Sequence, residues 1–200
     1  MIKMRKKVLL LAPHLDDIEL GAGGFVAKLS EQKSEITYIG FYAPEYLREE
    51  HNASAEILGI NKSILLDFEN RTFPKHRQEI LQILYDYDQS HKVDLVLTPA
   101  RSDIHQDHET ITNEAIRAFR KSTILGYAVP GNNIGIKKNC LVILTARQIK
   151  KKAEAVLCYK SQFHRGPQFD PEYTLARSLN QDVHLDTKYI ELFEVIKLVI

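Results

Sequence analysis

Residues 8–24 read VLLLAPHLDDIELGAGG, and this stretch decides the fold. The apolar run 8–13 is short and continuous, as expected for a strand that is buried on both faces of a sheet. Apolar residues then recur at helical spacing and predict a helix over 21–32. The polar residues between the two lie where an α/β sheet presents its ligands, at the carboxyl end of a strand and just before a helix.

The same alternation of apolar run, polar loop and helical stretch continues along the chain. Further strands are expected at 36–41, 63–66, 93–98, 124–129 and 141–144, and further helices over 45–58, around 80–87, over 107–121 and from a cap at Thr145 to about 159. Strands alternating with helices of this length predict an α/β fold, a Rossmann-like doubly wound and mainly parallel sheet with helices on both faces.

The last part of the chain has a different character. Segment 165–171 is rich in Gly, Pro and Gln, which predicts a surface loop, and 189–199 returns to a strand-like apolar pattern. Because no repeat or linker divides the chain, residues 1–200 are expected to form a single domain.

Composition bounds the kind of protein. Of the 200 residues, 44% are hydrophobic and 26% are charged, which suffices for a buried core and excludes a mostly disordered chain. The formal net charge of +1 lacks the basic excess of a duplex-binding protein, so no nucleic-acid partner is expected. No apolar run approaches the ~20 residues of a membrane helix, so no membrane insertion is expected. Cys140 and Cys158 lack metal or redox spacing and no export signal precedes them, which predicts free thiols and a cytoplasmic location.

His14, Asp16 and Asp17 form a polar cluster directly after the first strand. The adjacent carboxylates repel each other unless a cation or hydrogen-bond donors compensate, and a divalent metal would do so. His14 and Asp17 stand three residues apart across a turn and could reach one ion together, which would leave Asp16 free for proton transfer. The other interpretation is a capped loop, with one aspartate at the helix N-terminus and His14 on the surface. These residues alone leave both interpretations open.

Gly21, Gly23 and Gly24 raise a different possibility, a nucleotide- or phosphate-binding loop. The dinucleotide fingerprint G-x-G-x-x-G needs a third glycine where this chain has Val26, and no acidic residue ends the second strand. The glycines are therefore expected to serve close helix–sheet packing or the close approach of a ligand. A Rossmann-like nucleotide- or phosphate-binding protein stays as an alternative.

A second polar cluster, Asp103, His105, Asp107 and His108, follows the strand at 93–98 and opens a helix. If the two strands are neighbours, both clusters lie at one edge of the sheet, at a topological switch point. A catalytic zinc ion takes three protein ligands and keeps one position open for water, and other divalent metals accept the same donors. We expect His108, at the start of the helix, to complete the ligand set begun by the first cluster. His105 is then left near the open position, with Asp107 or Asp103 to orient it.

With these two clusters the chain resembles the LmbE/PIG-L family of zinc-dependent N-acetyl-sugar deacetylases. The family's first motif, A-[HP]-[PH]-x-D-D-x-x-x-G-x-G-G, is similar to residues 12–24, and its second, H-x-D-H, is similar to residues 105–108. Weaker agreement around 48–59, 152–162 and 189–194 extends the resemblance over nearly the whole chain.

The resemblance implies a division of roles. The implied ligands of Zn²⁺, or of another divalent metal, are His14, Asp17 and His108. Asp16 looks like the general base. A protonated His105 would face the developing oxyanion or the leaving amine, with Asp107 as its partner.

Two departures from the family pattern concern the loop and the substrate. Leu15 stands where the family commonly has proline, which is expected to loosen the loop without removing a ligand. Arg48 lies about one position from the expected substrate arginine. The candidate substrate-binding residues are Arg48, Asp103 and Tyr127, and the loops expected to contact substrate are 42–48, 124–133 and 163–170.

The expected function is a metal-dependent hydrolase that removes an acetyl group from an N-acetylated amino sugar or its conjugate, with zinc-activated water and Asp16 as general base. The expected partner is therefore a small molecule, and a homo-oligomer is compatible with this function. A non-catalytic sugar-binding relative is the remaining alternative, disfavoured because the implied ligands and base are all present in the sequence.

Overall fold

The computed structural model describes residues 6–135, 137–181 and 184–199, and these build one sheet in the order β3-β2-β1-β4-β5-β7-β6. The strands are β1 (Lys7–His14), β2 (Glu35–Tyr42), β3 (Lys62–Leu65), β4 (Leu95–Pro99), β5 (Thr123–Tyr127), β6 (Cys140–Leu144) and β7 (Tyr189–Lys197). The first five run parallel, and β7 is antiparallel to both of its neighbours, β5 and β6. The predicted doubly wound, mainly parallel α/β sheet is confirmed.

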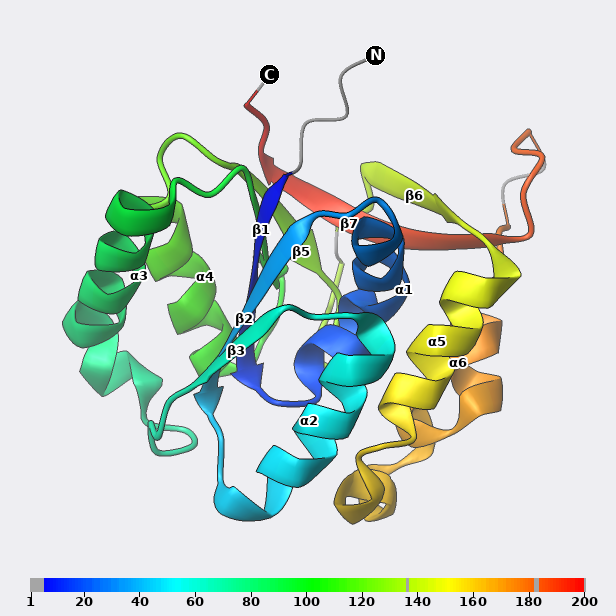
Figure 1. The fold of residues 1–200 in the computed structure, drawn as a ribbon, viewed down its shortest axis with the longest axis horizontal. Helices are drawn as coiled ribbons and strands as arrows, with labels where there is room; N and C mark the ends of the chain where they lie inside the picture. The colour runs from blue at the N-terminus through cyan, green and yellow to red at the C-terminus, as the bar shows by residue number, and fades with distance from the viewer. Residues whose placement is uncertain (1–5, 136, 182–183, 200) are drawn as a thin grey trace.

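Helices cover both faces of the sheet (Figure 1). On one face lie α3 (Arg77–His91) and α4 (Gln106–Ala118), and on the other lie α1 (Asp17–Glu31), α2 (Glu45–Leu58), α5 (Ala146–Val156) and α6 (Pro171–Arg177). Leu10 of β1 belongs to the core beneath α1, α2 and α5, whereas Leu9 and Leu11 belong to the core beneath α3 and α4. Successive strand residues point to opposite faces, so the continuous apolar run predicted for this strand reflects two separate cores.

Local sequence signals set the helix ends. Gly59 ends α2 in the left-handed region, with φ at 72°, and Thr145 begins α5 in a capping box with Gln148, both as predicted. The helix predicted to begin at position 21 begins instead at Asp17, because Ile18 already faces the core.

The glycines of α1 allow the helix to lie close to its neighbours. A Cβ atom at Gly21 would lie 2.4 Å from a ring carbon of Tyr127, and one at Gly24 would lie 2.6 Å from Leu144. Both distances are shorter than a van der Waals contact, so a side chain at either position would force Tyr127 or Leu144 to move. Of the two predicted uses of these glycines, close helix–sheet packing is therefore the one seen.

The segment predicted as a surface loop, 165–171, is folded. It contains the end of one short 3₁₀ helix (Lys160–Arg165), a second (Pro167–Phe169) and the start of α6. Most of the segment is at the surface, as predicted, but it is not an irregular loop, because Phe169 is only 3% exposed and Asp170 caps α6 by accepting the N–H of Glu172. These contacts fold the segment back over the loop that follows β1.

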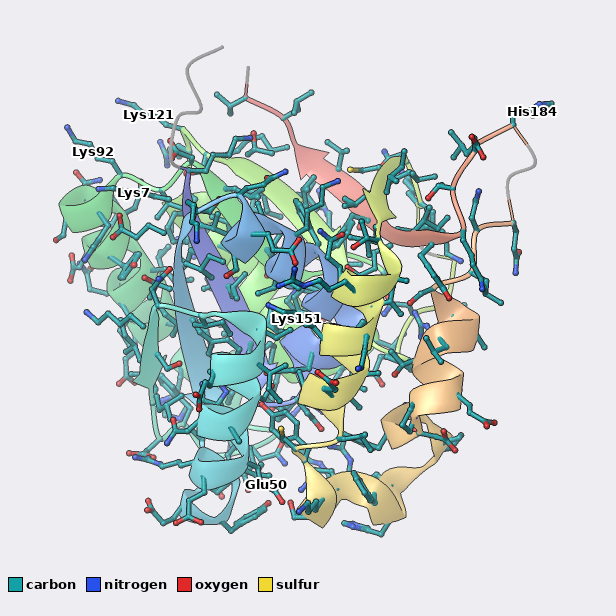
Figure 2. All side chains as sticks on the ribbon, turned by 45° about the vertical axis from the view of Figure 1, so that its right-hand side comes forward. Lys7, Glu50, Lys92, Lys121, Lys151 and His184 are labelled. Carbon is teal, nitrogen blue, oxygen red and sulfur yellow. The ribbon has the colours of Figure 1, made fainter. Side chains whose placement is uncertain are left out.

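Charged side chains mark the two ends of the molecule. Lys7, Lys92 and Lys121 gather where β1 and β4 begin, and Glu50 lies at the opposite end (Figure 2). The lysines are therefore remote from the sheet edge at which the two polar clusters follow their strands. Within the described ranges, no helix is long and apolar enough to span a bilayer.

Candidate metal centre

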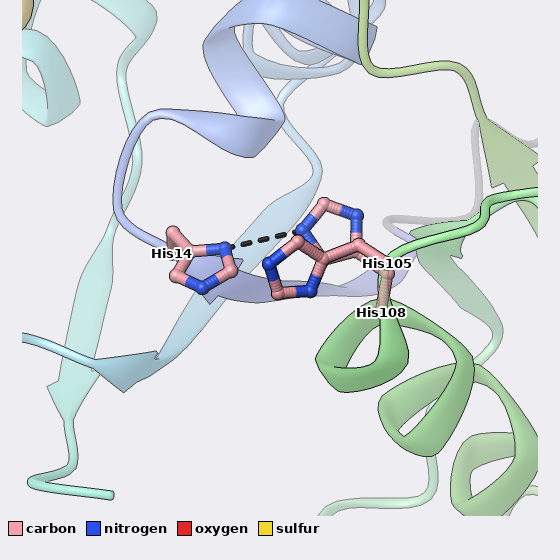
Figure 3. Close-up of side chains that lie close together, drawn as sticks. All are labelled: His14, His105 and His108. Carbon is pink, nitrogen blue, oxygen red and sulfur yellow. Dashed lines mark hydrogen bonds between the residues drawn. The ribbon is translucent and has the colours of Figure 1, made fainter. Parts of the chain in front are cut away.

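The two polar clusters meet at the carboxyl edge of the sheet. β1 pairs in parallel with β4, as predicted, and also with β2, so the strand order reverses beside β1. His14 ends β1, while His105 and His108 lie at the start of α4, and the three imidazoles face one another (Figure 3). The crevice at such a switch point is where open α/β sheets bind ligands.

Three donor atoms form a nearly equilateral triangle. His14 Nδ1 lies 3.1 Å from His108 Nε2, and Asp17 Oδ2 lies 3.2 Å from each of these nitrogens. Ligands held at 2.0–2.1 Å in a tetrahedron around zinc lie about 3.3 Å apart. The triangle therefore has the size of one face of such a tetrahedron, and nitrogen and oxygen donors are of the kind zinc accepts.

His105 offers a second way to complete a histidine set. One ring nitrogen from each of His14, His105 and His108 lies within 4.8 Å of the others. Nδ1 of His105, however, accepts the backbone N–H of Asp107 at 3.2 Å, so only Nε2 is free to face the cluster. The triangle with Asp17 is tighter, which favours Asp17 as the third ligand and leaves His105 beside the open side.

Partners behind the imidazoles fix which nitrogen faces the cluster. Asp103 Oδ2 lies 2.8 Å from His108 Nδ1, and Asn70 Oδ1 lies 3.2 Å from His14 Nε2. A hydrogen bond at one ring nitrogen leaves the other nitrogen with its lone pair directed at a metal. Asp103, expected at the substrate, is 5% exposed and also accepts the N–H of His105, so its carboxylate is occupied in orienting the cluster.

Asp107 does not face His105 as expected. Its carboxylate accepts the backbone N–H groups of Arg71 at 2.6 Å and Phe73 at 3.2 Å, and lies 3.7 Å from His14 Nε2. These contacts anchor the segment after β3 to α4. The carboxylate of Asp107 thus lies behind the imidazole of His14. Asp107 contacts His105 through its backbone N–H, which donates to Nδ1 of that ring.

Asp16 is buried beside the triangle and pairs with an arginine from far along the chain. Its side chain is 4% exposed, and its Oδ2 accepts a hydrogen bond from Arg165 Nη1 at 2.8 Å. Burial and the neighbouring Asp17 carboxylate raise the pKa of Asp16 above its ordinary value, and the Arg165 guanidinium opposes that rise. Asp16 is therefore a buried carboxylate that is outside the ligand triangle.

The ionisation of the cluster follows from its mixed charges. Burial alone would raise the pKa of Asp17, but His108 and His14 outweigh it and hold that pKa far below its ordinary value. Burial opposes protonation of both imidazoles. Contacts with Asp107 and Asp17 nevertheless raise the pKa of His14 to about 10. Asp17 and Asp103 raise the pKa of His108 to about 9. Without a metal, protons serve as the compensating charge.

His105 behaves in the opposite way. Burial and the two neighbouring imidazoles lower the pKa of His105 below its ordinary value of 6.5. As its Nδ1 accepts the N–H of Asp107, the neutral ring carries its proton on Nε2, on the side of the cluster. The lowered pKa favours a neutral ring at the N-cap of α4 over the protonated His105 that was expected.

A hollow of about 250 Å³ opens onto the cluster. It is smaller than the roughly 300–1,000 Å³ that hold a drug-sized ligand, so it suits the reacting part of a substrate. Besides the cluster itself, the lining includes Tyr42, Tyr46, Asn70, Arg71, Asn132, Gln162, Arg165 and Gln168. All three loops expected to contact substrate contribute to it. A larger hollow of about 870 Å³ between α3 and α4 contains none of the cluster's residues.

None of the three candidate substrate residues lines this hollow, and Asp103 lies behind His108. Arg48 donates to Ala43 O at 2.9 Å, in the loop after β2, and to Asp67 Oδ1 at 2.5 Å, in the segment after β3. Tyr127 is fully buried, and its hydroxyl donates to Leu11 O at 2.8 Å in β1. The structure therefore gives Tyr127 a place in the core and Arg48 a place at the start of α2.

Several residues that line the hollow were not among the candidates expected from the sequence. Asn70 and Arg71 follow β3, and the rule that parallel strands end at one edge would have pointed to them. No spacing in the sequence joins Arg165 to Asp16, because a folded segment after α5 brings them together.

Fold and cluster together define a class: a doubly wound α/β protein whose switch point carries a histidine–carboxylate site suited to one divalent metal. Residues 9–119 match the family model of GlcNAc-PI de-N-acetylase, PIG-L. The chain belongs to this family of de-N-acetylases.

One relative by sequence and two solved structures are similar to this chain. Over 190 residues the chain is 25% identical to the diacetylchitobiose deacetylase of Thermococcus kodakarensis, covering 79% of this chain and 70% of the relative. The conserved protein TT1542 from Thermus thermophilus has the same fold, with a TM-score of 0.78 and 24% identity over 97% of both chains. The 4-carboxy-2-hydroxymuconate hydratase GalB of Pseudomonas putida also shares the fold, with a TM-score of 0.78 and 18% identity over 98% of both chains. Since a hydratase shares the fold, the reaction has to be argued from the site.

Proposed function

We propose that this protein is a zinc-dependent hydrolase that removes the acetyl group from an N-acetylated amino sugar or its conjugate. The observation that carries the proposal is the triangle of His14 Nδ1, Asp17 Oδ2 and His108 Nε2, with sides of 3.1–3.2 Å beside a buried carboxylate. Membership of the de-N-acetylase family and the Thermococcus relative support the choice of reaction.

His14, Asp17 and His108 would hold the metal, with Asn70 and Asp103 fixing the orientation of the two imidazoles. When bound there, zinc would supply Lewis acidity and a water with its pKa lowered to about 7. A three-residue ligand set leaves the fourth position free for water or substrate, which distinguishes a catalytic site from a closed structural one.

Asp16 is the proposed general base. It is adjacent in sequence to a ligand, buried, and outside the triangle, so its carboxylate can take a proton from the attacking water. Arg165 holds Oδ2 and thereby orients the group. The proton that Asp16 accepts is then available for the nitrogen that leaves, so that amide and water give a free amine and acetate.

His105 is proposed to stabilise the negative charge that develops on the acyl oxygen. Its neutral ring donates through Nε2–H, because its Nδ1 is occupied by the N–H of Asp107. A donor held in place before the reaction needs no reorganisation as charge develops. Placement at a helix N-terminus further favours the neutral form.

The lining of the hollow supports a sugar as the acetylated group. Tyr42 and Tyr46 offer ring faces for a pyranose, and Asn132 and Gln168 offer amides for its hydroxyl groups. The hollow is small, so the remainder of a conjugate would extend outside it.

The test uses the purified full chain and a panel of substrates. Acetate and primary amine are measured after incubation with N-acetylglucosamine, N,N′-diacetylchitobiose and an N-acetylglucosaminyl phosphodiester, before and after chelation and after return of Zn²⁺, Co²⁺ or Mn²⁺. The proposal predicts stoichiometric release of acetate and amine that chelation abolishes and a divalent metal restores. If the protein binds these sugars but releases no acetate in a metal-dependent reaction, it is a non-catalytic sugar-binding relative. If it binds nucleotides instead, it is a nucleotide-binding protein and the proposal is wrong.

A further inference from the structure

The backbone of Leu15 is fixed by two hydrogen bonds from residues outside the metal loop. It lies between His14 and Asp16, and its carbonyl oxygen accepts hydrogen bonds from two phenol hydroxyls, those of Tyr38 at 2.8 Å and of Tyr159. Both tyrosines are fully buried, and neither lines the hollow at the metal cluster. They come from different elements: Tyr38 from β2, and Tyr159 from the segment after α5.

The side chain of Leu15 is also fixed. It is fully buried against β2, where a Cβ atom at Gly40 would lie 2.4 Å from Leu15 Cδ2. Only glycine at this position lets the leucine pack so closely on the strand. The expected loosening of the loop by leucine in place of proline is therefore countered, because contacts hold both the carbonyl and the side chain.

Tyr159 is itself held by a buried polar network. Its hydroxyl lies 3.1 Å from Glu19 Oε1 and 3.3 Å from His51 Nδ1. Ser54 donates to the same Glu19 oxygen at 2.7 Å, and His51 Nε2 lies 2.8 Å from Ser63 Oγ. The network ties α1, α2 and β3 to the tyrosine, so its hydroxyl cannot move away from Leu15 without breaking these contacts.

The peptide that these hydroxyls hold is the centre of the metal loop. His14 and Asp17 lie on either side of it, and the backbone N–H of His14 donates to Asp17 Oδ2 at 2.8 Å. A rotation of the Leu15–Asp16 peptide plane would displace Asp16 and Asp17 relative to His14. Two hydrogen bonds to one carbonyl prevent that rotation.

We propose that Tyr38 and Tyr159 are positioning residues: through the Leu15 carbonyl they hold Asp17 in the ligand triangle and Asp16 beside it. The inference rests on the proposed metal centre. It adds two residues to that centre that make no contact with metal or substrate.

Tyr→Phe substitutions test this, because they remove only the hydroxyl. The variants are Tyr38→Phe, Tyr159→Phe and the double variant. Tyr127→Phe is the matched control, since Tyr127 is also fully buried and its hydroxyl also donates to a backbone carbonyl, that of Leu11 in β1, outside the loop. Each single substitution removes one buried hydrogen bond and is expected to lower stability by a similar amount.

The deciding measurements are the affinity for Zn²⁺, by competition with a chromophoric chelator, and the visible absorption spectrum of the Co²⁺ form. We expect about tenfold weaker zinc binding for each loop variant and up to about a hundredfold for the double variant, the range seen when groups that orient ligands are removed. The Co²⁺ spectrum should change in the same variants, while Tyr127→Phe keeps the affinity and spectrum of the parent.

The outcomes separate this inference from the proposed function. If the parent binds zinc and all the variants bind it equally, with one Co²⁺ spectrum, the tyrosines are merely structural and the inference is wrong. If Tyr127→Phe weakens binding as much as the loop variants do, the effect is general destabilisation and the inference is again wrong. A parent that binds no divalent metal overturns the proposed function and this inference with it. If the double variant does not fold, the two single variants, which each keep one hydroxyl on Leu15, decide the matter.

Discussion

Arg165 Nη1 lies 2.8 Å from Asp16 Oδ2, although 149 positions separate the two residues in sequence. Half of the arginine side chain is exposed, whereas the aspartate is buried beside the ligand triangle. The contact sets the charge environment of the group proposed to accept a proton from water. It also makes the segment after α5 part of the site.

Replacing Arg165 is expected to impair turnover without removing metal. Because the guanidinium opposes the rise in the pKa of Asp16, Arg165→Ala should raise that pKa further and shift the acidic limb of the kcat/KM profile to higher pH. A half-exposed pair contributes little, so the loss at neutral pH should be up to about fivefold. Arg165→Lys, which keeps a cation, should shift the limb less. An unchanged acidic limb in Arg165→Ala would show that the arginine does not act on the base.

Asp103 is expected to govern metal affinity through His108. Its Oδ2 lies 2.8 Å from His108 Nδ1, and Asp103→Asn should weaken metal binding roughly 10- to 100-fold. Activity should then return when metal is added in excess. Asp94→Asn is the matched control, because Asp94 accepts the backbone N–H of Lys7 at the opposite edge of the sheet. Equal metal affinity in the two variants would contradict the orienting role.

Glu19 is expected to make stability depend on pH. It is fully buried, and burial raises its pKa from 4.5 to about 8. Between pH 4.5 and about pH 8, Glu19 is ionised in the unfolded chain but protonated in the folded one. The stability that protonated Glu19 contributes is therefore complete below about pH 4.5 and is lost as the pH rises toward 8. Over that window the parent should lose up to about 1.4 kcal/mol per pH unit relative to Glu19→Gln. Urea unfolding of both proteins between pH 5 and pH 8 tests this, and parallel pH dependences would refute it.

Asp16→Asn is expected to separate binding from chemistry. The substitution keeps the shape of the side chain and the contact with Arg165 but removes the proton acceptor. Metal content should stay near that of the parent, while turnover falls by roughly two to four orders of magnitude. His108→Ala, in contrast, should lose both metal and activity. Full activity in Asp16→Asn would show that Asp16 is not the general base, and His105 would then be the next candidate.

The sequence predicts the strands and helices of this protein well, because these elements depend on local patterns. The unbroken apolar run of β1 indicates a strand with a core on each side, and two such strands with polar residues at their carboxyl ends indicate a shared edge. From these patterns alone the convergence of the two clusters could be predicted. The cap at Thr145 and the glycine at position 59 likewise act within a few residues of their own position.

The contacts that complete the site could not be predicted, because they join distant segments. Arg165 reaches Asp16 only because buried Phe169 and the cap at Asp170 fold its segment back. Tyr127 was expected to contact substrate. Its ring instead occupies the space that the absent side chain of Gly21 leaves between α1 and β5. The protonation of His105 depends on how two neighbouring imidazoles and the backbone N–H of Asp107 are arranged in space, which the motifs do not record.

The proposed function requires that one divalent metal ion binds between the two loops. The most direct test is a crystal structure of the metal-loaded protein, with anomalous diffraction collected at the zinc absorption edge. We expect one anomalous peak at about 2.0–2.2 Å from His14 Nδ1, Asp17 Oδ2 and His108 Nε2, with a water or substrate atom as a further ligand. An anomalous peak bound by all three histidines without Asp17, a metal elsewhere in the protein, or no peak at all would contradict it.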